Sequence, residues 1–449
     1  MRPQPIVVVL LAASLAAADD LPNPFRDIPA ERHGWELLVE AGDLIARAER
    51  DTYVPVYPDP WNPTRPAIVA YLQSNAPALA KLDEALAKPE LRRPDDWFEG
   101  EYSVRSKQFA RWRELARLKS QRAHLRRAQG DLVGALRDCE DILTLAERLD
   151  QSGGLAIDYL VTRAMQGIAL ANAGLLLGPP PVGWEPAMFP PREQWPVPAY
   201  GPAERAALLA FASHVADERG CLPAVQGALT GEHRYFAVEL HELNSQLPTP
   251  LTEAEIGQLA AWRRECAEAA AAYAALPAWE RPTDWVCPTA PASVVKFGEA
   301  ADQIADASFL GYLAKRLDAD RAGRRMTVVA IALRLYAGDH GRLPATLADL
   351  VHEGYLPTVP LDPLSNGAIG YDLDRGLLTC GPLDGGRPRA DRRTRLDFVV
   401  TVDLKPSPPY VFDPADWIFE RDIYDRMLER QRPRRSEERR VGKECRSRW

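Results

Sequence analysis

Apolar residues recur every three or four positions over most of the chain, which is the period of amphipathic helices. Helices are expected on this basis at residues 34–50, 67–88, 109–128, 132–149, 155–177, 203–219, 222–243, 253–276 and 324–337. Near the C-terminus a short helix at 345–351 precedes segments 368–373, 377–380 and 398–404, where extended strands are expected. The sequence therefore predicts a mainly α protein, a helical-hairpin bundle followed by a small α/β module.

The clearest local signal is a helical hairpin made of residues 109–128 and 132–149. Its turn holds Gly130, which suits a left-handed helix stop, and Asp131, which can cap the second helix. The segment QGDLVGAL around this turn resembles one tetratricopeptide-type unit. Only one copy is evident, and an array needs about three units to bury its faces, so we expect a hairpin within a larger bundle.

Proline-rich segments divide the helical pattern. Nine prolines between residues 178 and 202 exclude a regular helix there, and the tryptophans among them favour a join packed against the helices over a free tether. The expected organisation is a helical domain at 19–177, the join at 178–202, a second helical segment at 203–321, the α/β module at 322–404 and a C-terminal extension at 405–431.

Both ends of the chain carry distinct signals. Residues 1–18 have a basic start, an apolar run too short to span a bilayer and a small-residue end at Ala16-Ala17-Ala18, which is typical of a secretory signal peptide. We therefore expect a periplasmic or secreted protein that starts near Asp19 and has no membrane span after cleavage. Residues 432–449 resemble a translated vector sequence and are interpreted as a non-native basic tail.

Charge and cysteine content narrow the function classes. The chain of 449 residues carries a net charge of −8 although residues 429–449 alone carry nine basic and four acidic side chains. Such an acidic body argues against a nucleic-acid partner and against an anionic membrane surface. Protein partners are expected instead. Outside the tail, disulfides among the cysteines are permitted by export, and Cys221 with Cys266 or Cys287 is a candidate pair that the sequence does not decide. The five cysteines are Cys139, Cys221, Cys266, Cys287 and Cys380.

The module carries a resemblance to a known family. The segments ALRLYAGDHGRLPATLADLV and YLPTVPLDP, within residues 324–404, resemble the head of major pseudopilins of type II secretion systems. With the helical stretches, they also resemble a broad group of exported bacterial proteins without an assigned activity. The pseudopilin resemblance implies a calcium ion in the loop after the closing hairpin, where this hard cation takes oxygen ligands. The calcium candidates here are Asp384, Asp391 and Asp397.

One segment suggests metal chemistry. GEHRYFAVELHEL places His233 and His241 eight residues apart on an expected helix, without the spacing of a known zinc motif. No catalytic residue or cofactor is assigned, and we expect a structural or protein-interaction component of the cell envelope. Two alternatives stay open, which are a metal-dependent hydrolase centred on His233 and His241, and a pseudopilin-like secretion subunit.

Overall fold

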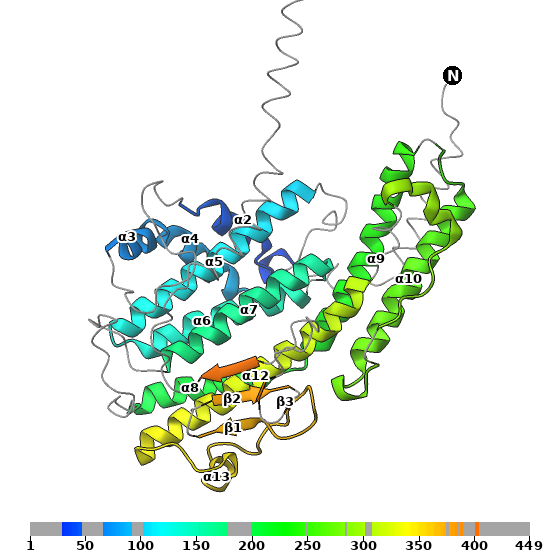
Figure 1. Ribbon diagram of the computed structural model, residues 1–449. Coiled ribbons are helices and arrows are strands. Elements are labelled where there is room, and N and C mark those ends of the chain that lie inside the picture. Colours follow the sequence, from blue (N-terminus) through cyan, green and yellow to red (C-terminus); the bar gives the residue numbers. More distant parts are fainter. Residues whose placement is uncertain are drawn as a thin grey trace, which may run out of the picture. The chain divides into compact units, whose positions relative to one another are not determined.

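The computed structural model describes residues 29–46, 66–91, 102–151, 153–177, 199–247, 249–282, 285–300, 308–373, 377–381, 383–384, 387–388 and 400–403. All of them belong to one unit of the chain, made of residues 1–184 and 190–406. The second unit, residues 185–189 and 407–449, lies outside the described residues, as do the expected signal peptide and basic tail. The described part is mainly helical, as the apolar pattern predicts (Figure 1).

The N-terminal helices are α2 (Trp35–Asp43), α3 (Pro66–Ser74) and α4 (Ala76–Ala87). The single helix expected at 67–88 is divided at Asn75. The fully buried side chain of Asn75 accepts a hydrogen bond from the Ala46 N–H (2.9 Å) and donates one to the Tyr71 carbonyl (2.9 Å). Pro77 lacks an N–H and therefore suits the first turn of a new helix rather than a helix interior.

Three long helices follow, α5 (Tyr102–Ala128), α6 (Leu132–Gln151) and α7 (Ala156–Leu176). They pack in chain order, α5 on α6 and α6 on α7 (Figure 1). The predicted hairpin turn between α5 and α6 is confirmed, because Gly130 has φ +85° and the Asp131 carboxylate accepts a hydrogen bond from the Gly134 N–H at 2.8 Å. The helices therefore form adjacent pairs.

The next helices are α8 (Pro202–Ala216), α9 (Cys221–Gln246) and α10 (Glu253–Ala275), followed by short 3₁₀ turns at Ala278–Glu280 and Ala292–Ala300. A capping box marks the start of α10. The Thr252 hydroxyl accepts from the Glu255 N–H (3.3 Å), and the Glu255 carboxylate accepts from the Thr252 N–H (2.8 Å). α9 and α10 pack against each other as another pair.

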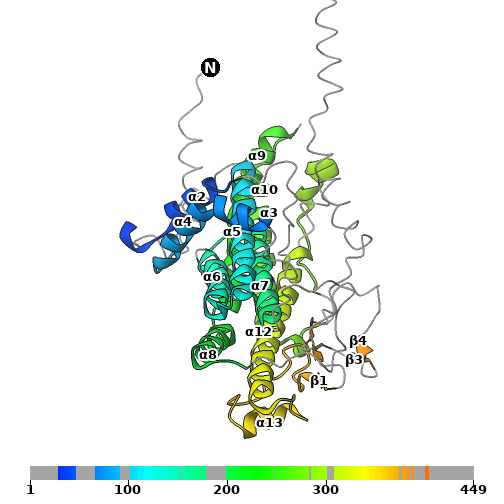
Figure 2. The same ribbon diagram turned by 90° about the vertical axis from the view of Figure 1, so that its left-hand side faces the viewer.

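Helix α12 (Ser308–His340) is the longest described helix. The sequence pattern predicts a helix at 324–337 within a module that begins at 322, whereas the helix of the structure already begins at Ser308. Residues 308–340 contain no proline, so nothing removes a backbone donor within this helix. The helix stops at Gly341, where φ is +67°, and α13 (Leu347–His352) follows near its end (Figure 2).

A small antiparallel sheet lies on α12. Strand β2 (Leu377–Cys380) pairs with β1 (Gly370–Asp372) on one side and with β5 (Val400–Asp403) on the other, so the order is β1-β2-β5. A pair that the sequence does not predict, β3 (Leu383–Asp384) with β4 (Arg387–Pro388), lies between β2 and β5 in the chain. The buried Asp362 fixes the approach to this sheet by accepting hydrogen bonds from the Gly381 N–H (2.9 Å) and the Ser365 hydroxyl (2.6 Å).

Three apolar cores hold these elements together. The first joins α2 to α8 and reaches Ile331 and Leu335 of α12, so it includes side chains from both sides of segment 178–202. The second joins α9, α10 and the first half of α12. The third joins the second half of α12 to α13 and the sheet. Because α12 contributes to all three cores, it ties the helical body to the module.

The cysteines are all unbridged thiols among the described residues, and two of them are neighbours. Cys266 on α10 and Cys287 in the following segment have their sulfur atoms 3.2 Å apart. Cys221 lies instead beside Asp320, with its sulfur 3.6 Å from a carboxylate oxygen. The structure therefore favours Cys266 with Cys287 over the pairs that include Cys221.

Oxidation is expected to join Cys266 and Cys287. Glutathione disulfide would accept the two electrons that the thiols lose, and each thiol would release a proton. The closed loop contains about twenty residues, which in the chain-entropy model is worth roughly 3 kcal/mol. Mass spectrometry of alkylated peptides should find the 266–287 bridge, and the bridged protein should melt at a higher temperature than the reduced one.

Cys221→Ala is the matched control, because this change should leave the bridge intact. Two results would contradict this pairing. One is a bridge between Cys221 and either Cys266 or Cys287. The other is a Cys287→Ser variant whose melting temperature rises with oxidant as that of the wild type does.

Candidate functional site

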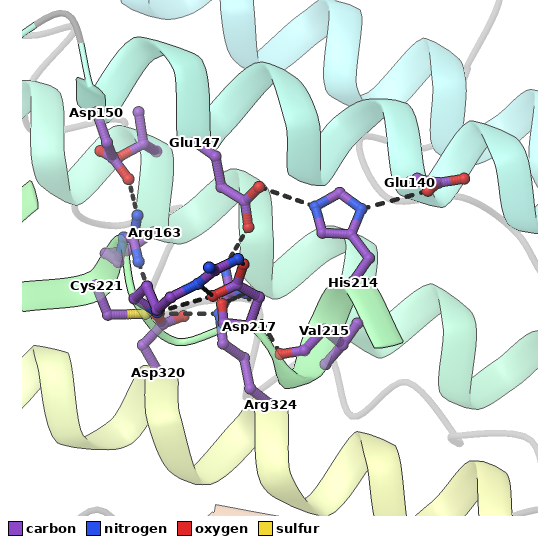
Figure 3. Close-up of polar contacts among 12 residues, drawn as sticks. Glu140, Glu147, Asp150, Arg163, His214, Val215, Asp217, Cys221, Asp320 and Arg324 are labelled. Carbon is purple, nitrogen blue, oxygen red and sulfur yellow. Dashed lines mark hydrogen bonds and ion pairs between the residues drawn. The ribbon is translucent and has the colours of Figure 1, made fainter. Parts of the chain in front are cut away.

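A polar cavity of about 150 Å³ opens where α6, α7, α8, α9 and α12 approach one another. Its lining is mostly charged or amide-bearing, unlike the apolar cores around it. The side chains that matter most are Glu147, Asp150, Arg163, Gln166, His214 and Arg324. Figure 3 shows that these elements bring acids and bases from distant parts of the sequence into one network.

Arg163 of α7 is the centre of one half of the network. Its guanidinium is 2% exposed and pairs with Asp150 of α6 and, at 2.6 Å, with Asp320 of α12. The same guanidinium stacks over the Tyr159 ring, 4.8 Å from its centroid. Because a buried cation is stable only when it is compensated, these contacts fix the relative positions of α6, α7 and α12.

Arg324 of α12 is the centre of the other half. It is 1% exposed, pairs with Glu147 at 2.8 Å and lies 3.5 Å from Asp320, one turn earlier on its own helix. It also donates to the carbonyl oxygens of Val215 and Asp217, at 3.5 and 3.3 Å. Although burial opposes its charge, the neighbouring carboxylates hold the pKa of Arg324 above its usual range. The end of α8 is thereby anchored to α12.

His214 of α8 lies at the mouth of the cavity between two glutamates of α6. Its Nδ1 is 3.4 Å from a Glu140 oxygen and its Nε2 is 2.8 Å from a Glu147 oxygen (Figure 3). Hydrogen bonds to Glu140 and Glu147 raise the pKa of His214 to about 9, against a burial effect in the other direction. The imidazole is therefore a cation at neutral pH and a poor general base.

Cys221 does not have the surroundings of a nucleophile. It lies at the N-terminus of α9 and is 3% exposed, with its sulfur directed at Asp320. Burial, and then the charge of Asp320, raise the pKa of the Cys221 thiol to about 12, so the reactive thiolate is not populated at neutral pH. Together with the protonated His214, this excludes an activated Cys–His pair in the cavity.

Gln166 of α7 differs from every other lining residue. Its side chain is fully buried, and neither its amide oxygen nor its amide nitrogen has a hydrogen-bond partner among the described residues. The charged side chains around the cavity have ion-pair partners, although the Nε of Arg163 has no hydrogen-bond partner among the described residues, whereas both polar atoms of Gln166 lack one.

The sequence-predicted site residues lie elsewhere. His233 is a buried residue of α9, and only the backbone of His241 is described. Glu232 beside it has a structural partner, since its carboxylate accepts from the Ala156 N–H at 2.7 Å at the start of α7. Of the calcium candidates, Asp384 is described by its backbone in β3, whereas Asp391 and Asp397 lie outside the described residues.

The described side chains include no group of three or more His, Cys, Asp or Glu residues arranged to hold a metal ion. Among the described helices, none combines enough length with enough apolar character to cross a membrane. The best candidate for a binding site among the described residues is therefore the polar cavity between α6, α7, α8, α9 and α12.

Sequence reasoning missed this cavity although a signal was present. Arg163 and Gln166 stand three residues apart within α7, and Asp320 and Arg324 stand four apart within α12, so each pair shares one face of its helix. Such pairs are normally read as solvated surface. These pairs can be recognised as buried only when the helices that pack against them are known, because a buried polar face requires polar partners from elsewhere in the chain.

Comparisons with protein-family models, curated protein sequences and solved structures gave no match to this chain.

The pairing of His214 predicts a pH-dependent stability. Its pKa is raised from 6.5 to about 9 on folding, so its contribution is fully present below pH 6.5 and is lost as the pH rises through 9. We expect His214→Gln to lower the free energy of unfolding by about 2 kcal/mol at pH 6 and by almost nothing at pH 10. The value at pH 6 is smaller than the whole pKa shift implies, because Glu140 is partly exposed to solvent. Urea unfolding at a series of pH values measures this. His352→Gln, an exposed position of α13, is the control, and an equal loss at pH 6 and pH 10 would contradict the prediction.

The buried pairs of Arg163 predict a large mutational effect. Arg163→Met keeps the length of the side chain but leaves Asp150 and Asp320 without this cation, which is expected to cost about 3–5 kcal/mol. Urea denaturation measures the loss. The matched control is Arg219→Met, because Arg219 is 90% exposed and pairs with Asp217 at the surface, so its midpoint should stay unchanged. Similar midpoints for the two variants would show that the buried network does not hold the helices.

Proposed function

We propose that this protein is an exported component of the cell envelope that binds other proteins through its helical body and its C-terminal module. The observation that carries the proposal is the order and packing of the secondary-structure elements in the C-terminal module. A long helix, a short helix and an antiparallel sheet packed on the long helix follow one another in chain order. This order supports a pseudopilin-like head, a module used in protein assemblies, and a secretion-apparatus subunit is the second candidate for the same reason.

The helical body supports the same function. α5, α6 and α7 pack in chain order, and α9 packs on α10, so neighbouring helices form pairs as they do in tetratricopeptide-like hairpins. Scaffolds of stacked helix pairs commonly present extended surfaces to partner proteins. No contact among the described residues favours the metal-dependent hydrolase.

One surface of the body is a candidate for the contact. Large apolar side chains are exposed within residues 276–295, between α10 and α12, and the most exposed are Val286 (80%) and Val295 (74%). Trp279 in the same segment is 44% exposed. A contiguous patch of exposed apolar side chains is typical of protein-binding surfaces, and crosslinking tests whether this segment forms one.

Site-specific photocrosslinking in the native cells tests this surface. Benzoylphenylalanine at Val286 or Val295 is expected to trap the same discrete partner, because both side chains extend from one segment. Arg219, which is exposed but charged, is the control position and should give no adduct. Adducts of equal yield from all three positions, or none from any, would contradict a specific contact here.

Export is tested separately by the mass of the mature chain. The proposal expects a periplasmic or secreted protein that begins near Asp19. A protein that keeps Met1 and stays in the cytoplasm would remove the envelope from the proposal, whatever the crosslinking shows.

A further inference from the structure

The amide of Gln166 is the starting point. A side chain that is 0% exposed normally has its polar atoms hydrogen-bonded, because an unpaired buried amide costs free energy. Gln166 has two unpaired polar atoms and lines a cavity. A carboxamide offers a donor and an acceptor side by side, so its natural complement is a group with an acceptor beside a donor, such as another amide.

Arg163 adds a donor on the same side of α7. Its two terminal nitrogens are engaged by Asp150 and Asp320, whereas its Nε has no hydrogen-bond partner among the described residues. Residues 163 and 166 are three apart and therefore neighbours on one helix face. The wall thus offers two donor nitrogens and one acceptor oxygen, which suits a carbonyl oxygen with an N–H beside it.

The charges around the cavity favour a cation over an anion. Counting the lining side chains and their ion-pair partners among the described residues, the carboxylates outnumber the cations by one even when His214 is protonated. The carboxylates are Glu140, Glu147, Asp150, Asp217 and Asp320, and the cations are Arg163, His214, Arg219 and Arg324. Both buried guanidiniums already have carboxylate partners, and Glu147 and Asp150 already have cationic ones, so it is the excess of one carboxylate that favours a cationic ligand.

The volume limits the ligand to a small molecule. A cavity of about 150 Å³ is comparable to engineered protein cavities that hold one benzene molecule. The opening is polar, since His214 and Glu147 at its mouth are 21% and 27% exposed at their side chains. A ligand of a few heavy atoms with a charged end towards the mouth therefore fits best.

From these observations we infer that the cavity is a binding site for a small amine that carries an amide, which is the chemistry of an amino-acid amide or of the amino end of a peptide. The amide pairs with Gln166 and the Nε of Arg163. The ammonium group lies towards the carboxylates Glu147 and Asp150. This site is independent of export and of any protein partner.

Calorimetric titration of the full-length protein with glycinamide tests the inference. Glycinamide has the amide and, at neutral pH, the ammonium group. Methylamine lacks the amide, acetamide lacks the charge and acetate is an anion. The expected result is saturable binding of glycinamide, at least tenfold weaker binding of methylamine and acetamide, and none of acetate.

Gln166→Leu is the decisive variant. It removes the amide at similar size, so the ligand-free protein should be as stable as the wild type or more so, because an unpaired buried group is lost. The same change should weaken glycinamide at least tenfold. Gln166→Met serves the same purpose if the leucine variant does not fold. Gln226→Leu, an exposed glutamine of α9, is the matched control and should bind glycinamide as the wild type does.

Three results would overturn the inference. Acetate binding more tightly than glycinamide would show that the charge argument is wrong. Glycinamide binding that survives in Gln166→Leu would place the ligand elsewhere. Absence of binding by all four probes would mean that the cavity holds only ordered water, which would then be the partner of Gln166.

Discussion

The rest of the structure depends on the compensation of two buried guanidiniums, those of Arg163 and Arg324. Asp320 lies between them on α12 and contacts both, at 2.6 and 3.5 Å. A buried charge without a partner is much more costly than a lost apolar contact, so the helices that supply the carboxylates are restricted to the positions in which every pair forms. The apolar cores supply the larger share of the driving force, but they tolerate small shifts that the ion pairs do not.

This restriction explains why a cavity persists in a well-packed region. Apolar side chains can fill a gap by changing rotamer, whereas Arg163 and Arg324 are held away from it by their partners. The backbone carbonyls of Val215 and Asp217 are also engaged by Arg324, so the chain between α8 and α9 cannot collapse inwards. Gln166 is thus left beside the cavity with its amide unpaired among the described residues. An unpaired amide is costly in the empty protein, and a ligand that pairs with it recovers that free energy.

The sequence predicted what depends on local pattern. Apolar periodicity located the helices, and Gly130 and Asp131 located the hairpin turn, because each signal is contained within a few residues. The break at Asn75 was missed although Pro77 is a local signal for it, and the contact of Asn75 with Ala46, 29 residues away, has no signal in the sequence. The continuity of α12 was missed because its two halves belong to different cores. The cavity was missed because its residues come from five helices that are distant in the sequence, and none of these residues is unusual by itself. The calcium candidates and His241 concern side chains outside the described part, so they stay predictions.

Helix α12 connects the two parts of the molecule for which functions are proposed. Arg324 faces the cavity, while Ala322 and Met326, two residues away on either side, belong to the core beneath the sheet. An α-helix transmits a rotation or a shift along its length because its backbone hydrogen bonds are continuous, and α12 has no proline at which the motion could be absorbed. A ligand that altered the contacts of Arg324 with Glu147 would therefore act on the same turn of helix that supports the module. The wall of the cavity and the support of the module thus share one turn of α12.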